Sequence, residues 1–535
     1  MSQPHVVLCD DLDPQAVALL EQRGLAVTVS TGLDENGLVA AAAEADALVV
    51  RSASKITRRV IESGERLKAV GRAGIGVDNI DTAAATERGV VVMNTPGGNT
   101  LSTAELALSL CLALARNVVP ADGRTRGGTW NKKGLMGTEI TGKCLGVVGL
   151  GRVGRLLAER ALGIGMQVSA YDPHLEASGL RGSGLEDIQL VPLDKLLVDA
   201  DFISLHVPLV DATRGLIGPE QLATMKPSAY LVNTSRGGVV DEVALAQALE
   251  QGQLAGAALD VLEQEPPASD HPLIGHEKVV LTPHLGASSK EAQARVAVMV
   301  AEQLADFLLD GVIKHAVNLP PLPNRPASET AGALDLTERM GRFAAQALGA
   351  PLGKVELTAN GPLAELGSEL LALSTQVGLL KPSMDTAVNF VNAPLLAKER
   401  GWRVLTAQEN DSVYQGGHLD LRVEDKDGNA SITLRGALFG DSPRIVRVRG
   451  VHVDLEPSGP HLLTAHVDQP GVLGKVGTVL GAHGINLRRV DLGSSTQHPD
   501  GLASAYLALD REPDGECLKA LREIEPVRQV LAIRL

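Results

Sequence analysis

A glycine-rich segment at residues 144–154 constrains the fold of this chain more than any other feature. It reads Cys-Leu-Gly-Val-Val-Gly-Leu-Gly-Arg-Val-Gly, so an apolar run precedes glycines spaced G-x-G-x-x-G, and a helical pattern follows from near Val153. Glycines there permit a tight turn and a close approach of the backbone to a pyrophosphate, while the helix N-terminus offers N–H donors. We therefore expect Gly149, Gly151 and Gly154 to form the phosphate-binding turn of a dinucleotide site.

Short apolar, β-branched runs alternate with helical patterns on both sides of this segment. Before it, the predicted strands are residues 5–9, 26–30, 47–51, 69–73 and 90–94. From it onward, they are residues 144–148, 167–171, 202–206, 230–233, 256–259 and 279–282. Apolar strands separated by helices are typical of parallel sheets covered on both faces. The sequence thus predicts two Rossmann-like, doubly wound α/β units with buried strands.

The rest of the chain divides at a proline-rich stretch, residues 318–326. Helical patterns at 100–117 and from 290 to about 311 belong to the α/β part. Residues 317–456 mix helices with alternating strands, carry no catalytic signature, and predict a separate α+β domain. Residues 461–535 follow the order βαββαβ, which predicts a small ferredoxin-like module.

Composition argues against several classes of function. The 535-residue chain has a net charge of −15, which disfavours general nucleic-acid binding because phosphate backbones attract basic surfaces. No apolar run approaches the roughly 18 residues that span a bilayer, and residues 106–115 come nearest. The four cysteines lack metal-ligand spacing and the N-terminus lacks a basic and apolar leader, so we expect no metal site and a reducing, cytoplasmic location.

An acidic residue, Asp172, ends the predicted strand 167–171 that follows the glycine turn. A carboxylate at this place accepts hydrogen bonds from the adenosine ribose and repels a 2′-phosphate. Pro173 and His174 come next, rather than an arginine. The sequence therefore favours NAD over NADP.

Arg236, Glu265 and His284 each come shortly after a predicted strand of the second unit. The carboxyl ends of parallel strands border the ligand crevice, so these residues form a candidate active site. Reduction of a 2-keto acid by hydride needs a proton donor, a partner that adjusts it, and a cation for the carboxylate. His284 would donate the proton in reduction and accept it in oxidation. Glu265 would raise the pKa of His284, and Arg236 would hold the substrate carboxylate and carbonyl.

Motifs of the second unit resemble those of D-2-hydroxyacid dehydrogenases, namely residues 149–154, 233–238, 265–267 and 283–287. Two segments of the first unit, 50–53 and 71–79, resemble the phosphoglycerate dehydrogenases of that family, and the likeness covers essentially the whole chain. The resemblance implies NAD-dependent oxidation of 3-phospho-D-glycerate (3-phosphoglycerate) to 3-phosphooxypyruvate, the first step of the phosphorylated route to L-serine.

The same resemblance assigns the site residues. It implies that Arg236, Glu265 and His284 are catalytic. The residues that it places at NAD are Gly149, Gly151, Arg152, Val153, Gly154, Asp172, Thr234, Ser235, Asp260, Gly286 and Ala287. The residues that it places at the carboxylate or phosphate of the substrate are Arg51, Arg72, Asn99, Lys132 and Arg236. Lys132 stands where relatives carry arginine, and Ile75 replaces a polar residue of some members.

Family architecture implies that residues 1–98 and 289–316 form a substrate-side domain and residues 99–288 an NAD-binding domain. It further implies association of subunits through the NAD-binding domain, with the apolar helix from near Leu101 at a dimer interface, and a homotetramer overall. No membrane or nucleic-acid partner is expected.

Residues 466–471 and 484–486 resemble the ACT regulatory domain, which implies that His466, Asp468 and Asn486 bind L-serine as an allosteric inhibitor. The alternative is that the first segment is only a turn and a helix start. The domain before it resembles the intervening domain of the longer phosphoglycerate dehydrogenases. In that domain, three residues are candidates for an anion site: Arg444, Arg449 and His452. The alternative is that they belong to a solvated strand edge.

Two other functions remain open from the sequence. The first is a dehydrogenase for 2-hydroxyglutarate, glycerate or another D-2-hydroxyacid, because the family shares its catalytic residues and differs in few substrate contacts. The second is an NAD-dependent corepressor that uses this fold as a scaffold for partners. The ACT-like segment argues against the corepressor.

Overall fold

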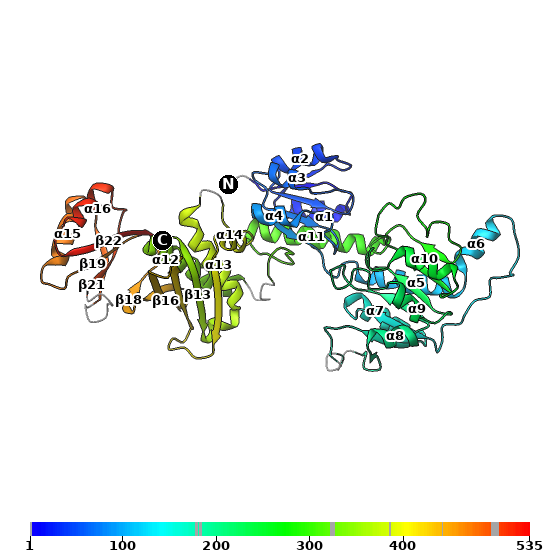
Figure 1. Cartoon of the computed structure of the whole chain (residues 1–535). Helices are drawn as coiled ribbons and strands as arrows, with labels where there is room; N and C mark the ends of the chain where they lie inside the picture. The colour runs from blue at the N-terminus through cyan, green and yellow to red at the C-terminus, as the bar shows by residue number, and fades with distance from the viewer. Residues whose placement is uncertain are drawn as a thin grey trace.

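The computed structural model describes residues 3–176, 180, 184–320, 327–384, 387–440, 442–493 and 502–535. Figure 1 shows four units in a row, each built around a sheet of its own. The C-terminal unit lies at one end of the row and the unit with the glycine turn at the other. The N-terminal unit adjoins the latter.

The first unit is a five-stranded parallel sheet in the order β2-β1-β3-β4-β5. Its elements are β1 (His5–Leu8), α1 (Pro14–Gln22), β2 (Ala26–Val29), α2 (Glu35–Glu44), β3 (Ala47–Val50), α3 (Arg58–Ser63), β4 (Ala69–Arg72), α4 (Thr82–Arg88) and β5 (Val91–Met93). All five predicted strands are present. The prediction that each is buried is wrong for β2, because this strand lies at the sheet edge and Val29 is 57% exposed.

Helix α11 (Lys290–Asp310) belongs to the core of the first unit although it comes late in the chain. It packs against α1 and β4 (Figure 1). The packing is close, since a Cβ atom on Gly71 of β4 would lie 2.6 Å from Val300 of the helix. The chain therefore returns to the first sheet after it has completed the second.

The second unit is a seven-stranded parallel sheet in the order β12-β11-β10-β9-β6-β7-β8. Its elements are α5 (Thr100–Ala115), α6 (Val118–Arg126), β6 (Cys144–Val148), α7 (Arg152–Gly163), β7 (Gln167–Tyr171), β8 (Gln189–Leu190), α8 (Leu193–Asp199), β9 (Phe202–Leu205), α9 (Pro219–Thr224), β10 (Tyr230–Asn233), α10 (Glu242–Glu250), β11 (Gly256–Leu259) and β12 (Val279–Leu281). The chain leaves β6 toward β7 and later returns to β9 on the other side. Such a switch point creates the ligand crevice of doubly wound folds. The two predicted α/β units are confirmed. Among the described residues of the second unit, the two-residue strand β8 is the one strand that was not predicted.

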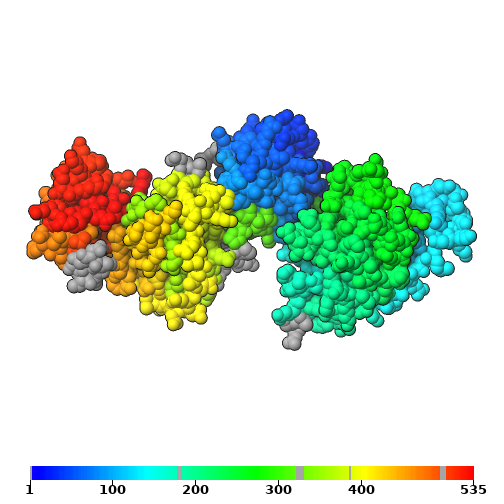
Figure 2. Space-filling model, viewed as in Figure 1, coloured from blue at the N-terminus to red at the C-terminus, as the bar shows by residue number. Residues whose placement is uncertain are grey.

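Helix α5 uses much of its apolar surface inside the second unit. Ala104, Ala107 and Cys111 are buried in the core that also holds β6 and α7. Helix α6 follows at an angle of 65°, and Figure 2 shows this segment, coloured cyan, protruding at the end of the molecule away from the first unit. Among the described residues no single helix is long and apolar enough to cross a membrane. Helices α5 and α6 reach that length and apolar content only when they are taken together as a bent pair.

The third unit is a six-stranded sheet in the order β14-β13-β15-β16-β17-β18, with two long helices packed against it. Its elements are α12 (Ala327–Leu348), β13 (Leu352–Asn360), the 3-10 helices η2 (Gly361–Leu366) and η3 (Lys381–Ser383), α13 (Ser368–Leu380), α14 (Ala393–Glu399), β14 (Arg403–Glu409), β15 (His418–Asp425), β16 (Ser431–Phe439), β17 (Ser442–Val448) and β18 (Val451–Leu455). Apolar residues alternate along β13 and β15, so the helix-covered face is the core and the opposite face is polar.

The fourth unit has the predicted βαββαβ order and the sheet order β20-β21-β19-β22. Its elements are β19 (Pro460–His466), α15 (Val472–Ala482), β20 (Leu487–Gly493), β21 (Ala503–Leu509), α16 (Gly515–Arg522) and β22 (Val527–Arg534). Antiparallel pairing with the two helices on one face makes this a ferredoxin-like module, as expected.

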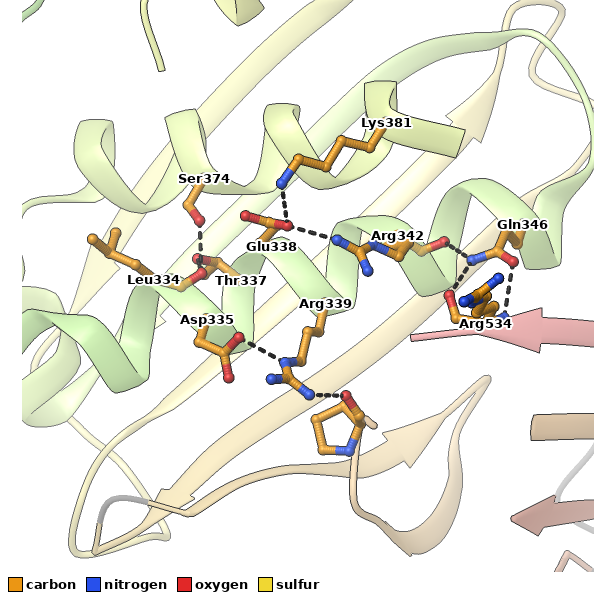
Figure 3. Close-up of polar contacts among 11 residues, drawn as sticks. Leu334, Asp335, Thr337, Glu338, Arg339, Arg342, Gln346, Ser374, Lys381 and Arg534 are labelled. Carbon is orange, nitrogen blue, oxygen red and sulfur yellow. Dashed lines mark hydrogen bonds and ion pairs between the residues drawn. The ribbon is translucent and has the colours of Figure 1, made fainter. Parts of the chain in front are cut away.

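Helix α12 joins the third unit to the fourth (Figure 3). The side-chain amide of Gln346 donates to the backbone oxygen of Arg534 and accepts from its backbone nitrogen, both at 3.0 Å, and so covers the edge of strand β22. Arg339 donates to the backbone oxygen of Pro457, in the connection between the two sheets. At the other side of the third unit, Asn389 donates to the backbone oxygen of Gly89 in the first unit. The third unit therefore contacts both its neighbours.

Candidate active site

The glycine turn between β6 and α7 has the geometry that a bound dinucleotide needs. Gly149 has a φ of +91°, and a Cβ atom there would lie 2.6 Å from the backbone oxygen of His206, so only glycine fits. A Cβ on Gly154 would lie 2.2 Å from the oxygen of Gly149, which brings the helix close to the strand. Gly151, between them, meets no atom within 4 Å. The open position is therefore the one where a pyrophosphate would approach the backbone.

The start of α7 provides the donors of this turn. Gly151 is its N-cap and has no side chain to accept from the first N–H groups, which belong to Arg152, Val153 and Gly154. These N–H groups and the positive end of the helix dipole attract a phosphate. The guanidinium of Arg152 also approaches Gly97, where a Cβ atom would lie 3.5 Å from its Nη1, so the first unit's exit segment borders the turn. These residues fit NAD.

Asp172 lies directly after β7, beside the turn. Its carboxylate accepts from the backbone nitrogens of Leu150 and His174, both at 3.0 Å. The side chain thus holds the glycine turn in shape. Its place at the strand end remains consistent with a ribose contact, since each oxygen can accept more than one hydrogen bond.

Three loops at the carboxyl ends of β10, β11 and β12 bring the predicted catalytic residues together. Nδ1 of His284 is hydrogen-bonded to an oxygen of Glu265 at 2.7 Å, and both side chains are partly open to solvent. His284 has a φ of +54°, which is uncommon for a residue with a side chain and costs about 1–3 kcal/mol. Its backbone nitrogen donates to the oxygens of Asp260 and Thr282, which hold it in this conformation.

The histidine and the carboxylate shift each other's titration. The hydrogen bond and charge of Glu265 raise the pKa of His284, against the opposing effect of burial. Burial opposes ionisation of Glu265, but the hydrogen bonds from His284 and from the backbone nitrogen of Leu262 outweigh it and lower the pKa of Glu265. The pair is therefore set to exchange a proton at Nε2 of the imidazole while Glu265 stays ionised.

Arg236 lies between this pair and the first unit. A Cβ atom on Gly76 of the first unit would lie 2.2 Å from its Nη2, and the carboxylate of Asp78 lies 3.5 Å from its Nε. Asn233, at the end of β10, shapes the Arg236 loop by accepting from Ser235 and donating to the oxygen of Arg236. Neither Asn233 nor Asp78 was predicted from the sequence as a site residue, although a polar residue at the end of an apolar strand is a usable signal for Asn233.

Arg51 and Arg72 extend the positive charge from Arg236 into the first unit. Burial, together with the positive charges of Arg236 and Arg51, lowers the pKa of Arg72 to about 10. Nε of Arg72 is buried without a hydrogen-bond partner, and a Cβ atom on Gly74 would collide with its guanidinium. A cluster of arginines this close together, with one donor unused, is suited to a multiply charged anion.

Loop residues of the first unit fix Arg51. The carboxylate of Asp10 accepts from its backbone nitrogen and from the hydroxyl of Ser54, and Asn79 donates to its backbone oxygen. The side chain of Arg51 donates to the backbone oxygen of Asp11. None of these partners was predicted from the sequence, because they come from separate loops.

Among the residues expected at NAD, Asp260 is almost fully buried and acts as an anchor in the structure. Its carboxylate accepts from the hydroxyl of Thr282 and from the backbone nitrogens of Leu285 and Gly286 at 2.6–2.9 Å. Burial raises the pKa of Asp260, and these hydrogen bonds counteract the rise. Asp260 thus positions the loop that bears His284 and ends at Ala287.

Two further residues expected at the ligands have unused polar atoms. The hydroxyl of Thr234 and the side-chain oxygen of Asn99 are both buried without a hydrogen-bond partner. Thr234 follows β10, and Asn99 begins α5 where the chain crosses between the units. Unpartnered buried polar atoms are expected where a ligand completes the hydrogen bonding.

Lys132 is exposed in the segment that follows α6. Figure 2 shows this cyan part of the chain at the end of the molecule away from the first unit. Arg236 and the other cluster arginines lie where the second unit meets the first, since Arg236 pairs with Asp78 and is close to Arg72. A single chain therefore does not bring Lys132 to the other predicted substrate contacts.

His466 and Asn486 lie at opposite ends of the fourth unit's sheet. His466 pairs with Ala503 and Leu487 with Leu509 on the same strand, β21, so the ends are roughly 20 Å apart. Nε2 of His466 is buried without a hydrogen-bond partner, the backbone nitrogen of Asn486 donates to the carboxylate of Asp510, and Asp468 is exposed. A site containing both His466 and Asn486 would require two copies of the chain.

The arginines singled out in the third unit have protein partners. Arg444 lies within 4 Å of Asp454 and Glu456, and the His452 ring is hydrogen-bonded to Arg447. Arg449 reaches the side-chain oxygen of Gln529 in the fourth unit. These contacts favour the solvated strand edge over a dedicated anion site.

Comparison with protein families gives three matches along the chain. Residues 108–286 match the NAD binding domain of D-isomer specific 2-hydroxyacid dehydrogenases. Residues 332–449 match the D-3-phosphoglycerate dehydrogenase intervening domain, and residues 462–526 match the ACT domain. The matches coincide with the second, third and fourth units.

Two relatives that match along nearly their full length are named D-3-phosphoglycerate dehydrogenase. The chain is 39% identical over 530 residues to the D-3-phosphoglycerate dehydrogenase of Methanocaldococcus jannaschii, covering 99% of each chain. It is 42% identical over 517 residues to that of Mycobacterium tuberculosis, covering 96% of each. The similarity extends through all four units.

Solved structures match the two α/β units. A protein of Thermus thermophilus aligns with a TM-score of 0.54 and 36% identity, covering 58% of this chain and 99% of that one. The D-lactate dehydrogenase of Aquifex aeolicus, solved with NAD and lactic acid, aligns with a TM-score of 0.51 and 26% identity, covering 59% of this chain and all of that one. The paired arrangement of the two sheets thus occurs in experimentally determined structures.

Proposed function

This chain belongs to the D-3-phosphoglycerate dehydrogenases within the D-isomer specific 2-hydroxyacid dehydrogenase family, and we propose that it oxidises 3-phospho-D-glycerate to 3-phosphooxypyruvate. It is an NAD-dependent dehydrogenase. The observation that supports the substrate most directly is the buried cluster of Arg51, Arg72 and Arg236 beside the hydrogen-bonded pair of His284 and Glu265. Several cations are required to bind a carboxylate and a phosphate on one small molecule.

In the proposed reaction NAD supplies the hydride acceptor. The C2 hydroxyl gives its proton to Nε2 of His284, the C2–H bond breaks with transfer of hydride, and a C2 carbonyl forms. Glu265 holds Nδ1 and stabilises the imidazolium that results. Arg236 holds the carboxylate and the developing carbonyl, while Arg72 and Arg51 face the phosphate end. The reverse reaction uses His284 as the proton donor.

The substrate is tested by initial rates of NADH formation from 3-phospho-D-glycerate, D-2-hydroxyglutarate and D-glycerate. We expect the phosphorylated acid to have the highest kcat/KM and His284→Ala to abolish the rate. Arg72→Ala should raise the KM for 3-phospho-D-glycerate by roughly 10- to 100-fold and affect D-glycerate less, because a charged hydrogen bond to phosphate is lost. Arg59→Ala, an exposed arginine of α3, is the control. A higher kcat/KM for an unphosphorylated acid would overturn the substrate.

We also propose that L-serine regulates this chain through the ACT domain as the product of its pathway. The orphaned Nε2 of His466 supports a polar ligand at the end of β19. Because His466 and Asn486 lie far apart within one chain, the proposed site combines His466 and Asp468 of one copy with Asn486 of a second. Inhibition by L-serine that disappears in His466→Ala would support this site, whereas unchanged inhibition in that variant would exclude it.

The proposed enzyme is a homo-oligomer, in keeping with the tetramer expected for the family. Trp130 and Met136, which flank Lys132, are 91% and 93% exposed on the protruding segment after α6. Large apolar side chains this exposed are typical of a surface that a partner covers. A second copy packed there would bury these two side chains and bring its active site to Lys132 of the first copy. Light scattering of Trp130→Ser, compared with the unaltered chain, tests this association.

A further inference from the structure

Glu242 ties together two parts of the loop that carries Glu265. It is the first residue of α10, and its Oε1 accepts from the backbone nitrogen of Glu263 at 2.7 Å. Its Oε2 lies 2.8 Å from Nε2 of His271. Glu263 and His271 lie on either side of Glu265 in the sequence. One carboxylate therefore holds both ends of the segment that positions a proposed catalytic residue.

The peptide between Leu262 and Glu263 connects this contact to the active site. Leu262 donates its N–H to Oε1 of Glu265 at 3.0 Å, while the next N–H, that of Glu263, goes to Glu242. On its other side the peptide touches Gly237, where a Cβ atom would lie 2.0 Å from the oxygen of Leu262. Movement of this peptide would thus displace the carboxylate that holds His284.

Capping of α10 does not account for this arrangement. The N-cap residue Asp241 already accepts from the backbone nitrogen of Ala244 at 2.9 Å. Glu242 directs its carboxylate to the loop instead, with a side chain only 9% exposed, and that of His271 is 16% exposed. A nearly buried pair between a helix and a loop holds the loop in one position, because separating the two partners would leave a polar group unpaired.

We propose that Glu242 and His271 are positioning residues that keep Glu265 against His284. This inference rests on the proposed function, since it assumes that Glu265 and His284 act in catalysis. The Glu242 carboxylate acts through the Leu262–Glu263 peptide and not on the substrate. Loss of the pair should therefore leave cofactor binding intact and alter the titration of His284.

The chain offers variants that should fold. Glu242 and His271 line a cavity of about 500 Å³ together with Arg214, Asp241 and Glu263, so water can replace a truncated side chain. Glu242→Gln retains an oxygen that accepts from the Glu263 nitrogen, but its amide group cannot accept from Nε2 of His271, whose Nδ1 already accepts from Leu273. Glu242→Ala removes both contacts. Glu250→Ala, at the exposed end of the same helix, is the matched control.

The test is the pH dependence of kcat/KM for the oxidation of 3-phospho-D-glycerate, with NAD affinity and Tm measured for each variant. Glu242→Ala should lower kcat by about ten- to a hundredfold, as expected for a slight misplacement of reacting groups. It should also move the acidic limb to lower pH, because Glu265 no longer fully raises the pKa of His284. NAD affinity should stay within about twofold, and Glu242→Gln should recover part of the rate, because it keeps the contact to the Glu263 nitrogen and loses the one to His271.

A fall in Tm with an unchanged kcat and pH profile would overturn the proposal and leave Glu242 as a structural brace. An additive effect of Glu242→Ala and His271→Ala on kcat would also overturn it, since residues acting as one unit are not additive. If the unaltered enzyme oxidises no hydroxyacid, the proposed function fails instead. If it does and Glu242→Ala matches it at every pH, only the positioning role fails.

Discussion

A carboxylate oxygen of Asp78 lies 3.5 Å from Nε of Arg236, so an ion pair links the two α/β units across the candidate active site. Arg236 is the residue proposed to bind the substrate carboxylate. The Asp78 carboxylate therefore competes with the substrate carboxylate for the guanidinium of Arg236. Because Asp78 is largely exposed, the ion pair is weak and can exchange with an incoming anion.

Asp78→Asn should lower the KM for 3-phospho-D-glycerate. The substitution removes both the competition for Arg236 and a negative charge near an anionic substrate. We expect a decrease of about two- to fivefold at low ionic strength and a smaller one at high salt. Steady-state kinetics at two salt concentrations measure it. A KM that rises at both would mean that Asp78 orients Arg236 for the substrate.

Glu265→Gln should lower the pKa of His284, since the charge and hydrogen bond that raise it are lost or weakened. Oxidation requires a neutral imidazole, so the acidic limb of its pH profile should move to lower pH. Reduction requires the imidazolium, so its rate should begin to fall at lower pH than in the unaltered enzyme. The best rate in each direction should drop by about a hundredfold. Profiles that keep their limbs would show that Glu265 does not control this titration.

Gly151 and Gly154 should respond differently to alanine. Gly151→Ala adds a methyl group where nothing lies within 4 Å, so Tm should hold while the Kd for NAD rises by about tenfold. Gly154→Ala forces a Cβ to 2.2 Å from a backbone oxygen, so Tm should fall by about 2–10 °C. Thermal unfolding and NAD titration separate the two effects. Equal loss of Tm would contradict the open approach at Gly151.

Gln346→Ala should weaken the communication between the ACT domain and the rest of the chain. The amide of Gln346 makes both hydrogen bonds to the edge of β22 (Figure 3), and alanine leaves that edge unpaired. We expect an unchanged kcat without serine and a half-inhibitory serine concentration raised about fivefold or more. Gln408→Ala, on the exposed strand β14, is the control. Equal inhibition of both variants by serine would show that Gln346 does not connect the ACT domain to the active site.

The strands of both α/β units and the order of the ferredoxin-like module could be predicted from the sequence. Local patterns carry this information: apolar runs of four or five residues, glycine spacing in a turn and helical periodicity each act over short stretches of chain. The predicted strands gave the positions of the strand ends, and these in turn predicted that Arg236, Glu265 and His284 lie close together. The exposure of β2 could not be predicted, because the position of a strand within a sheet depends on the whole topology.

What the sequence determined by itself is therefore the set of elements and the chemical character of the residues that end them. The tertiary structure decided which side chains meet. Arg72 lies beside Arg236 although the two come from different sheets, and Glu242 holds the loop of Glu265 from a neighbouring helix. It also decided that His466 and Asn486 lie apart within one chain. Such contacts depend on the packing of segments distant in sequence, for which no local pattern carries a signal.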